Sequence, residues 1–330
     1  MIVIGWIDIP GYAIECINSL RLKKKLLVLT NNKKAKTKFL NSKVKIIDLK
    51  KSYNWNDITS RKPTHFFFTG WNTTAFMSLA KTKEVKNICM IDNIIKNNFR
   101  QFLGKFYFNF FFKKIFDAIF VPGIKSKEFL NYLGYKKKIY QGLYSCNEKI
   151  FYRRKKIIKR KYDFIYVGQF IKRKNILGLV RSFEIVNKNM NKNIKLKMIG
   201  NTNKISYNNS DITLLPFINS KKIAKHLNDA KCLVLPSYED HWGVVVHEAI
   251  RCGCVLILSN SVGSKSEFLK KNGFSFDIKK YGDLSLKMEK ILKLSDRELI
   301  NMSNKSVEIS KKRSLKYWNS QFKKILAEIR

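Results

Sequence analysis

The chain has 330 residues, enough for about two domains of ordinary size, and 45% of them are hydrophobic, which excludes a chain that is disordered throughout. Its 66 Lys and Arg residues face 24 Asp and Glu residues, so the formal net charge is +42. A charge of this size favours anionic partners, namely nucleic acid, anionic lipid or phosphorylated small molecules.

From the N-terminus onward, short apolar runs alternate with segments of helical length, a pattern typical of parallel sheets covered by helices. In the first half, strands are expected at 26–30, 43–49, 65–70, 87–92 and 118–123 and helices at 71–84 and 95–115. In the second half, strands are expected at 163–168, 195–200, 212–217, 231–237 and 254–259 and helices at 174–190, 220–230, 243–252 and 283–294. The sequence therefore predicts an α/β fold with one doubly wound, Rossmann-like parallel sheet in each half.

The two halves are expected to meet near residue 150. The stretch 151–161 is basic and has no apolar periodicity, so it is interpreted as a solvated connector. This gives an N-terminal domain over 1–150 and a C-terminal domain over 151–314. We expect no membrane-spanning helix and no signal peptide. The six cysteines lack the spacing of a disulfide framework or a zinc site, which indicates buried thiols in a cytoplasmic protein.

The most informative segment is 236–249, Pro-Ser-Tyr-Glu-Asp-His-Trp-Gly-Val-Val-Val-His-Glu-Ala, in which a strand ends and Gly243 opens a helix. Asp240 precedes that helix and Glu248 lies inside it, so both carboxylates can face one crevice and accept hydrogen bonds from sugar hydroxyls. The free N–H groups near Gly243 to Val245 suit a phosphate. The residues alone also allow Asp240 to be a helix cap and Glu248 a solvated side chain.

This segment resembles the motif P-S-x-x-E-G-F/W-G-x-x-x-x-E-A of retaining glycosyltransferases with the GT-B fold, the family called glycosyl transferases group 1. Asp240 stands where the family usually has Glu. Upstream, residues 166–175 resemble the family's V-G-R-x-x-x-x-K-G element, with Lys174 at the Lys position and Gln169 at the Arg position. Further matches in the correct order extend the resemblance over about 160–276, and they lie at 198–200, 214–218, 261–267 and 272–274.

The resemblance implies roles for three catalytic residues. Glu248 would bind the ribose of a nucleotide-diphosphate sugar, Asp240 would hold the transferred sugar, and Lys174 would neutralise the diphosphate. The lysine and the helix N–H groups would stabilise the charge that the leaving diphosphate gathers in the transition state. The other residues implied to bind the donor are Gly168, Gln169, Arg173, Phe217, Ile218, Trp242, Gly243, Val244 and Val245. We expect no metal and no other cofactor, because no D-x-D run is placed to hold one.

The N-terminal half is expected to bind the acceptor, since it carries that site in the family. Gly11 in the first loop and Asp92 at the end of a strand are the candidate residues there. His65, embedded in a strand, is interpreted as structural. In the family's fold the last helix crosses back to the first domain, so 315–330 is assigned to the N-terminal half.

The aromatic and basic run 99–114 has two interpretations. It could be a helix that lies in the headgroup layer of an anionic membrane, or a helix buried in the core. The high positive charge favours contact with an anionic membrane in either case, which fits a glycan or lipid-linked acceptor at the inner face of a cell membrane.

The leading hypothesis is thus a retaining hexosyltransferase-type enzyme of cell-surface polysaccharide or lipopolysaccharide synthesis. The alternatives are a basic nucleic-acid-binding protein and a non-catalytic GT-B partner subunit. Nucleic acid is not expected as a partner, because the charges are spread along the chain and no recognised nucleic-acid module appears.

Overall fold

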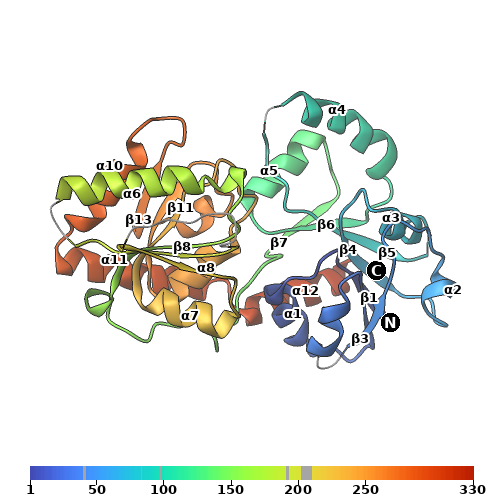
Figure 1. Ribbon diagram of the computed structural model, residues 1–330. Helices are drawn as coiled ribbons and strands as arrows, with labels where there is room; N and C mark the ends of the chain where they lie inside the picture. Colours follow the sequence, from blue (N-terminus) through green and yellow to red (C-terminus); the bar gives the residue numbers. More distant parts are fainter. Residues whose placement is uncertain (40–41, 83, 97, 191–192, 202–209) are drawn as a thin grey trace. The chain divides into compact units, whose positions relative to one another are not determined.

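The computed structural model describes residues 1–330 except 40–41, 83, 97, 191–192 and 202–209, and it describes only the backbone of 35–37. The chain divides into two compact units (Figure 1). Unit 1 contains Met1–Ser145 together with Leu315–Arg330, and unit 2 contains Cys146–Ser314.

Unit 1 is built on a seven-stranded, entirely parallel sheet in the order β3-β2-β1-β4-β5-β6-β7. Its strands are β1 Ile2–Gly5, β2 Leu26–Thr30, β3 Lys43–Ile46, β4 His65–Thr69, β5 Lys86–Met90, β6 Ala118–Val121 and β7 Lys138–Gln141. Its helices are α1 Gly11–Asn18, η1 Lys33–Lys38, α2 Trp55–Ile58, α3 Thr74–Ala80, α4 Phe99–Tyr107, the π-helical η2 Phe108–Phe112, α5 Ile124–Leu133 and α12 Leu315–Glu328. The strand order reverses between β1 and β4, and the crevice at such a point is where this kind of sheet binds ligands.

Unit 2 repeats the design with a six-stranded parallel sheet in the order β10-β9-β8-β11-β12-β13. Its strands are β8 Tyr162–Val167, β9 Leu196–Ile199, β10 Ile212–Leu215, β11 Ala230–Leu235, β12 Val255–Ser259 and β13 Gly273–Phe276. Its helices are η3 Ile157–Lys159, η4 Lys172–Lys174, α6 Ile176–Met190, α7 Ser220–Asn228, α8 Val244–Arg251, α9 Lys265–Phe268, α10 Asp283–Leu292 and α11 Asp296–Lys311. Here the order reverses between β8 and β11. The central strands are almost wholly buried and apolar, as parallel strands covered on both faces must be.

Helix α12 completes unit 1, far along the chain from the other elements of that unit. Figure 1 shows it, in red, beside the blue helix α1. The buried ring of Phe322 stacks on Phe67 of β4 with 4.2 Å between the centroids. The indole nitrogen of Trp318 donates a hydrogen bond to the carbonyl of Leu143 at 2.8 Å, and His65 Nε2 lies 2.7 Å from the carbonyl oxygen of Ile329. His65 therefore has a structural contact, and burial lowers its pKa.

The segment 151–161 is exposed at 152–156, 159 and 161, as the sequence suggested, but three of its residues are buried in unit 2. Phe151 and Ile157 are buried in unit 2. The guanidinium of Arg160 is buried too, and it donates hydrogen bonds to the carbonyls of Ala230 and Cys252 at 2.8 and 2.6 Å. The expectation failed because a buried arginine whose donors are satisfied by backbone carbonyls has the same sequence signature as a solvated one.

The run 99–114 does not form a buried core helix either. Helix α4 has no buried residue, and Phe99 is 72% exposed. The exposed side chains Phe99, Phe102 and Phe106 follow helical spacing, so they form one stripe along the helix. Only Phe108 and Phe112 of η2 reach the core of unit 1, where both rings pack edge-on against Trp71.

Candidate functional site

The candidate site of unit 2 lies where β8 and β11 end side by side. The loop after β8 contains Lys174 in η4, and the loop after β11 contains Asp240. The N–H of Tyr238 donates to the carbonyl of Arg173 at 2.8 Å, and Arg173 Nη1 donates to the carbonyl of Glu239 at 3.2 Å. These bonds, one between backbone groups and one from a side chain to the backbone, tie the two loops together, so the positions of Lys174 and Asp240 depend on each other.

The loops bring a cation and a carboxylate into direct contact. Lys174 Nζ lies 2.6 Å from Asp240 Oδ2, and the two side chains are 12% and 9% exposed. Asp240 is also anchored to the loop after β12, because the N–H of Gly263 donates to its carbonyl at 2.8 Å. A Cβ on Gly263 would lie 1.8 Å from the carbonyl oxygen of His241, so only glycine permits this approach.

The carboxylate of Asp240 lies at the start of helix α8. A Cβ built on Gly243, the residue before the helix, would be 3.3 Å from Asp240 Oδ2. Gly243 has a φ of 75°, a left-handed conformation that favours glycine. In the described part of the chain, no group accepts a hydrogen bond from the N–H of Val244 or Val245. The start of α8 therefore offers two donors and the positive end of the helix dipole next to the ion pair.

Glu248 lies on the same face of α8 as Val244 and Val245, since these three residues are partly exposed. The buried residues of the helix are Val246, His247, Ala249 and Ile250. Burial raises the pKa of the Glu248 carboxyl to about 7. Within the described residues the carboxyl makes no hydrogen bond or ion pair, so its four lone-pair positions are available to a ligand. A desolvated carboxyl without a partner is a costly feature for stability alone, and such groups mark candidate ligand sites.

The glycines at the ends of β8 and β9 allow the backbones to pack closely beside this site. A Cβ on Gly200 would lie 2.2 Å from the carbonyl oxygen of Gly168, and one on Gly168 would lie 2.6 Å from the hydroxyl of Tyr166. The hydroxyl of Tyr166 donates to the carbonyl of Gln169 at 2.9 Å. Burial, and then the charge of Asp240, raises the pKa of Tyr166. Tyr166 thus fixes the turn on which Gln169 stands.

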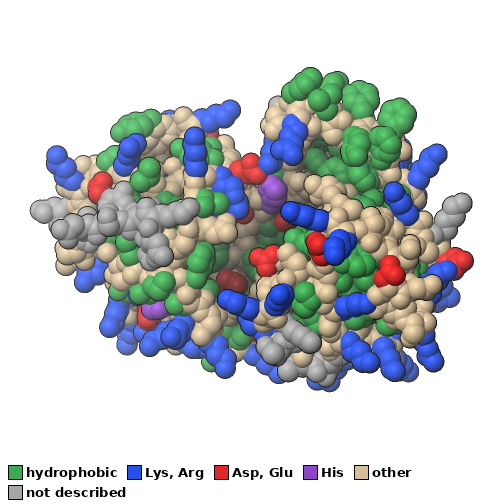
Figure 2. All heavy atoms as spheres, turned by 45° about the vertical axis from the view of Figure 1, so that its right-hand side comes forward, with side chains coloured by type: hydrophobic (Ala, Val, Ile, Leu, Met, Phe, Trp, Pro, Cys, Tyr) green, Lys and Arg blue, Asp and Glu red, His purple; other side chains and the backbone are tan. Residues whose placement is uncertain are grey.

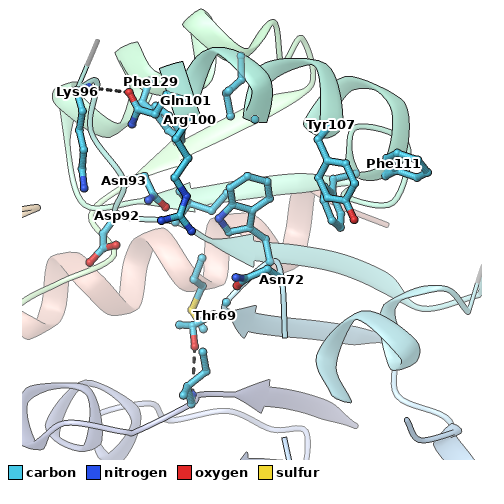
Figure 3. A pocket seen from close by; sticks show the side chains of 18 of the residues that line it. Thr69, Asn72, Asp92, Asn93, Lys96, Arg100, Gln101, Tyr107, Phe111 and Phe129 are labelled. Carbon is cyan, nitrogen blue, oxygen red and sulfur yellow. Dashed lines mark hydrogen bonds between the residues drawn. The ribbon is translucent and has the colours of Figure 1, made fainter. Parts of the chain in front are cut away.

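Unit 1 contains a separate cavity of about 1370 Å³ at the carboxyl ends of β1, β4 and β5, beneath α4 (Figure 3). Asp92 follows β5 in its wall, and the hydroxyl of Tyr144 donates to Asp92 Oδ2 at 3.0 Å. The pKa of Tyr144 is raised by burial and then by the charge of Asp92. Gly11 is the first residue of α1, between Pro10 and Tyr12, which both line the cavity.

A family model described as Glycosyl transferases group 1 matches residues 148–313, half of the chain. The chain belongs to this family. All three candidate catalytic residues lie in the matched region. A sequence search of curated proteins found no match.

Solved glycosyltransferase structures resemble this group 1 glycosyltransferase over its whole length. Sucrose-phosphate synthase from Thermosynechococcus elongatus is 13% identical with a TM-score of 0.77, and 99% of each chain is covered. A glycosyltransferase from Rickettsia africae is also 13% identical, with a TM-score of 0.78 over 99% of this chain and 98% of the other. HepE from Anabaena, solved with UDP and glucose, is 11% identical with a TM-score of 0.75 over 98% and 99%. At such identities the likeness shows the fold alone, and it confirms the GT-B prediction.

The residues proposed from the family motifs divide into two groups in unit 2. Lys174, Asp240, Gly243, Val244 and Val245 lie together at the start of α8, with Glu248 one turn further on. The other proposed residues of unit 2 lie outside this cluster or make other contacts.

Trp242 and Arg173 have structural contacts. The ring of Trp242 is buried, packs edge-on against Phe268 at 5.7 Å between centroids, and has the guanidinium of Arg313 over it. It therefore supports the start of α8 from inside the unit. Arg173 uses its guanidinium to bind the loop after β11, as described above. Gln169 is exposed beyond the end of β8.

Phe217 and Ile218 follow β10, where Phe217 is 57% exposed. They lie just before Asn219, whose side chain caps α7 by accepting a hydrogen bond from the N–H of Lys222. An exposed ring in a short, capped loop beside the strand ends is a suitable stacking surface for a base.

The reasoning from sequence missed Tyr166 and the cavity beneath α4. A tyrosine immediately before Val167-Gly168 was a signal that could have pointed to Tyr166, whereas the cavity depends on the path of α4. In the part of the chain that the structure describes, no three His, Cys, Asp or Glu side chains could hold a metal ion together. No described helix is long and apolar enough to cross a membrane.

Proposed function

We propose that this group 1 glycosyltransferase is a retaining enzyme that moves a sugar, of the hexosyl type, from a nucleotide-diphosphate donor to a lipid-linked glycan. Its place is in cell-surface polysaccharide or lipopolysaccharide synthesis at the inner face of the cell membrane. The observation that carries the donor half of the proposal is the Lys174–Asp240 pair beside the unpartnered Glu248 at the start of α8. HepE, which has the same fold, was solved in complex with UDP and glucose.

The geometry suits each part of such a donor. The N–H groups of Val244 and Val245 can donate to an anion bound at the start of α8, and Lys174 has further N–H donors beyond the one it gives to Asp240. The carboxyl of Glu248, one turn along, can accept hydrogen bonds from the ribose hydroxyls. Asp240, held by Lys174, is placed for the hydroxyls of the transferred sugar.

In the proposed reaction, the bond between the sugar's anomeric carbon and the diphosphate oxygen breaks, and the electron pair leaves with the diphosphate. The acceptor hydroxyl attacks the same face, and its proton passes to a phosphate oxygen of the leaving group. Lys174 and the start of α8 stabilise the charge that gathers on the diphosphate, which lowers the barrier because the charge is larger in the transition state. The proposal requires no metal or other cofactor.

The acceptor half of the proposal rests on unit 1. The apolar stripe of α4 is exposed, and Figure 2 shows hydrophobic side chains gathered over this part of the molecule with Lys and Arg nearby. A stripe of aromatic rings beside basic side chains suits the headgroup region of an anionic membrane. The cavity beneath α4, with Asp92 in its wall, is the site we assign to the acceptor.

The test is donor binding and turnover with purified protein. Thermal unfolding with a panel of nucleotide sugars should show one donor that raises the melting temperature, because a ligand specific to the folded state stabilises it. Lys174→Gln should lower turnover by about a hundredfold, the effect of removing a group that stabilises transition-state charge. Glu248→Gln should weaken donor binding, and Asp240→Asn should lower turnover.

Lys188→Gln is the matched control, because Lys188 is exposed on α6 and its loss changes the net charge equally. Wild-type turnover in Lys174→Gln and Asp240→Asn would contradict the catalytic assignment. Donor binding without turnover in the wild type would indicate a non-catalytic partner subunit. Binding of nucleic acid with a steep salt dependence, and no nucleotide binding, would favour the nucleic-acid alternative.

A further inference from the structure

The cavity of unit 1 is larger than a typical small-molecule pocket. Its volume of about 1370 Å³ exceeds the roughly 300–1,000 Å³ of such pockets. It opens at the strand ends of the sheet and continues beneath α4 and η2. A cavity of this size suits a long or large molecule.

One end of the cavity is polar. Asp8 and Asp92 contribute carboxylates there, and Asn72 and Asn93 contribute amides. Asp8 accepts a hydrogen bond from Asn32 at 3.0 Å, and Asp92 accepts the one from Tyr144, so both acids are held in place. Carboxylates and amides in fixed positions suit the hydroxyls of a glycan.

Arg100 reaches into the cavity from the first turn of α4. Figure 3 shows its side chain directed toward the sheet end where Asn72 and Asn93 lie. In the part of the chain that the structure describes, the guanidinium has no hydrogen bond or ion pair. An arginine presents its donors in a planar fork that matches two oxygens of a phosphate. Lys96, in the wall nearby, adds a second positive charge.

The far wall of the cavity is aromatic. Tyr107 and Phe111 lie further along the same helical run, and their ring centroids are 4.8 Å apart. Tyr107 is 55% exposed and Phe111 60%. Seven residues of helix place Tyr107 about 10 Å along the axis from Arg100. Exposed rings in a row beyond a cation suit an apolar chain that continues from an anionic group.

We propose that this cavity binds one lipid molecule whose hydrocarbon chain ends in a phosphate or diphosphate. The phosphate binds Arg100, the chain lies along Tyr107 and Phe111, and the hydroxylated group attached to the phosphate lies toward Asp92. The inference rests on the proposed function only in making this lipid the anchor of the acceptor. Binding of the lipid itself needs no donor.

The experiment titrates the full-length protein with decyl phosphate below its micelle concentration, by calorimetry. Decanol and inorganic phosphate are the comparison probes. Decyl phosphate should bind about tenfold more tightly than decanol, the value of a hydrogen-bonded charge. Shortening the chain should weaken binding about fourfold per methylene. Inorganic phosphate should not displace the lipid, which distinguishes a lipid site from a phosphate site.

Two pairs of variants locate the site. Arg100→Gln should weaken decyl phosphate binding about tenfold and leave decanol binding unchanged, while Lys114→Gln, which removes an equal charge outside the cavity, should have no effect. Phe111→Ser should weaken binding of both probes. Phe99→Ser should weaken neither, because Phe99 is also exposed on the same helical run and does not line the cavity. All four side chains are at the surface, so folding is not at risk.

The proposal is overturned if Arg100→Gln and Lys114→Gln act alike, if Phe99→Ser and Phe111→Ser act alike, or if decyl phosphate binds no better than decanol. These results are separate from those for the proposed function. Lipid binding in a protein that binds no nucleotide sugar would leave the cavity assignment standing and remove the transferase proposal. Donor binding without lipid binding would remove the cavity assignment and leave the transferase proposal standing.

Discussion

The protonation state of the Glu248 carboxyl should affect both the stability of the protein and its binding of a ligand. In the folded protein its pKa is about 7, because burial disfavours the charged form, whereas an ordinary glutamate has a pKa of 4.5. Between pH 4.5 and pH 7 the Glu248 carboxyl is ionised in the unfolded chain and protonated in the folded protein. The contribution of Glu248 to stability is therefore present below about pH 4.5 and is lost as the pH rises to 7.

Replacing Glu248 by Gln should remove the loss of stability that accompanies ionisation of this carboxyl as the pH rises. The variant should gain up to about 3 kcal/mol in its free energy of unfolding, relative to wild type, between pH 4.5 and pH 8. Urea unfolding of both proteins at the two pH values measures the difference. Glu289→Gln, which changes a carboxyl on α10, serves as the control. A difference between Glu248→Gln and wild type that is the same at both pH values would show that the pKa of Glu248 is ordinary.

The sequence could predict that the loops of the three catalytic candidates lie together, because ordered motifs fix their positions in the chain and parallel strands bring their loops to one edge of the sheet. The direction of a side chain was beyond such reasoning. Trp242 sits in the motif between Asp240 and Gly243, yet its ring turns into the unit and packs on Phe268. A buried ring and a ligand-facing ring have the same spacing in sequence.

Among the elements, most of the strands and helices follow from periodicity. The strands β1, β7 and β13 were not predicted, although other strands of the same length were. For α4, the composition of aromatic and basic residues is compatible with a buried helix and with an exposed one. Only the packing of Phe108 and Phe112 against Trp71, which anchors η2 and leaves α4 outside, decides between them.

The exposed stripe of α4 predicts binding to anionic vesicles. Cosedimentation with vesicles that contain anionic lipid should be strong at low salt and fall with salt, because each basic side chain near the surface contributes roughly 1 kcal/mol that screening removes. The double variant Phe99→Ser with Phe102→Ser should lower the bound fraction several-fold, since it removes two exposed rings from the stripe. Tyr281→Ser, which removes a ring that is 93% exposed in unit 2, is the control. Complete recovery of wild-type protein in the supernatant at low salt would contradict the membrane proposal.

For the molecule as a whole, the net charge of +42 is not explained by the site itself, where Lys174 is already paired with Asp240. Most of the basic side chains lie on the surface, where they repel one another and attract anionic partners. The composition could predict that attraction. The division into units could be predicted only in outline, because the sequence places the boundary near residue 150 and a connector over 151–161, whereas unit 2 begins at Cys146 and includes the buried Arg160.

Loss of the α12 contacts should destabilise unit 1 alone. Trp318→Ala removes a buried ring and its hydrogen bond to Leu143, and a core Trp→Ala change costs about 3–5 kcal/mol. Calorimetry of the full chain should then show one unfolding transition shifted to lower temperature while the other is unchanged. Tyr317→Ala, at the neighbouring and partly exposed position, should shift it less. An equal shift of both transitions would mean that the two units unfold as one.

Phe322 and Trp318 belong to the core of unit 1, but they lie near the end of the chain and are synthesised last. The order of synthesis therefore affects when unit 1 can fold. Residues 146–314 are a continuous stretch and can close their own core while the tail is still being synthesised. Residues 1–145 are synthesised first, and Phe67 stays uncovered until residues 315–330 leave the ribosome. A message truncated shortly after residue 314 would thus yield a folded unit 2 joined to an incomplete unit 1, the kind of product that proteases remove.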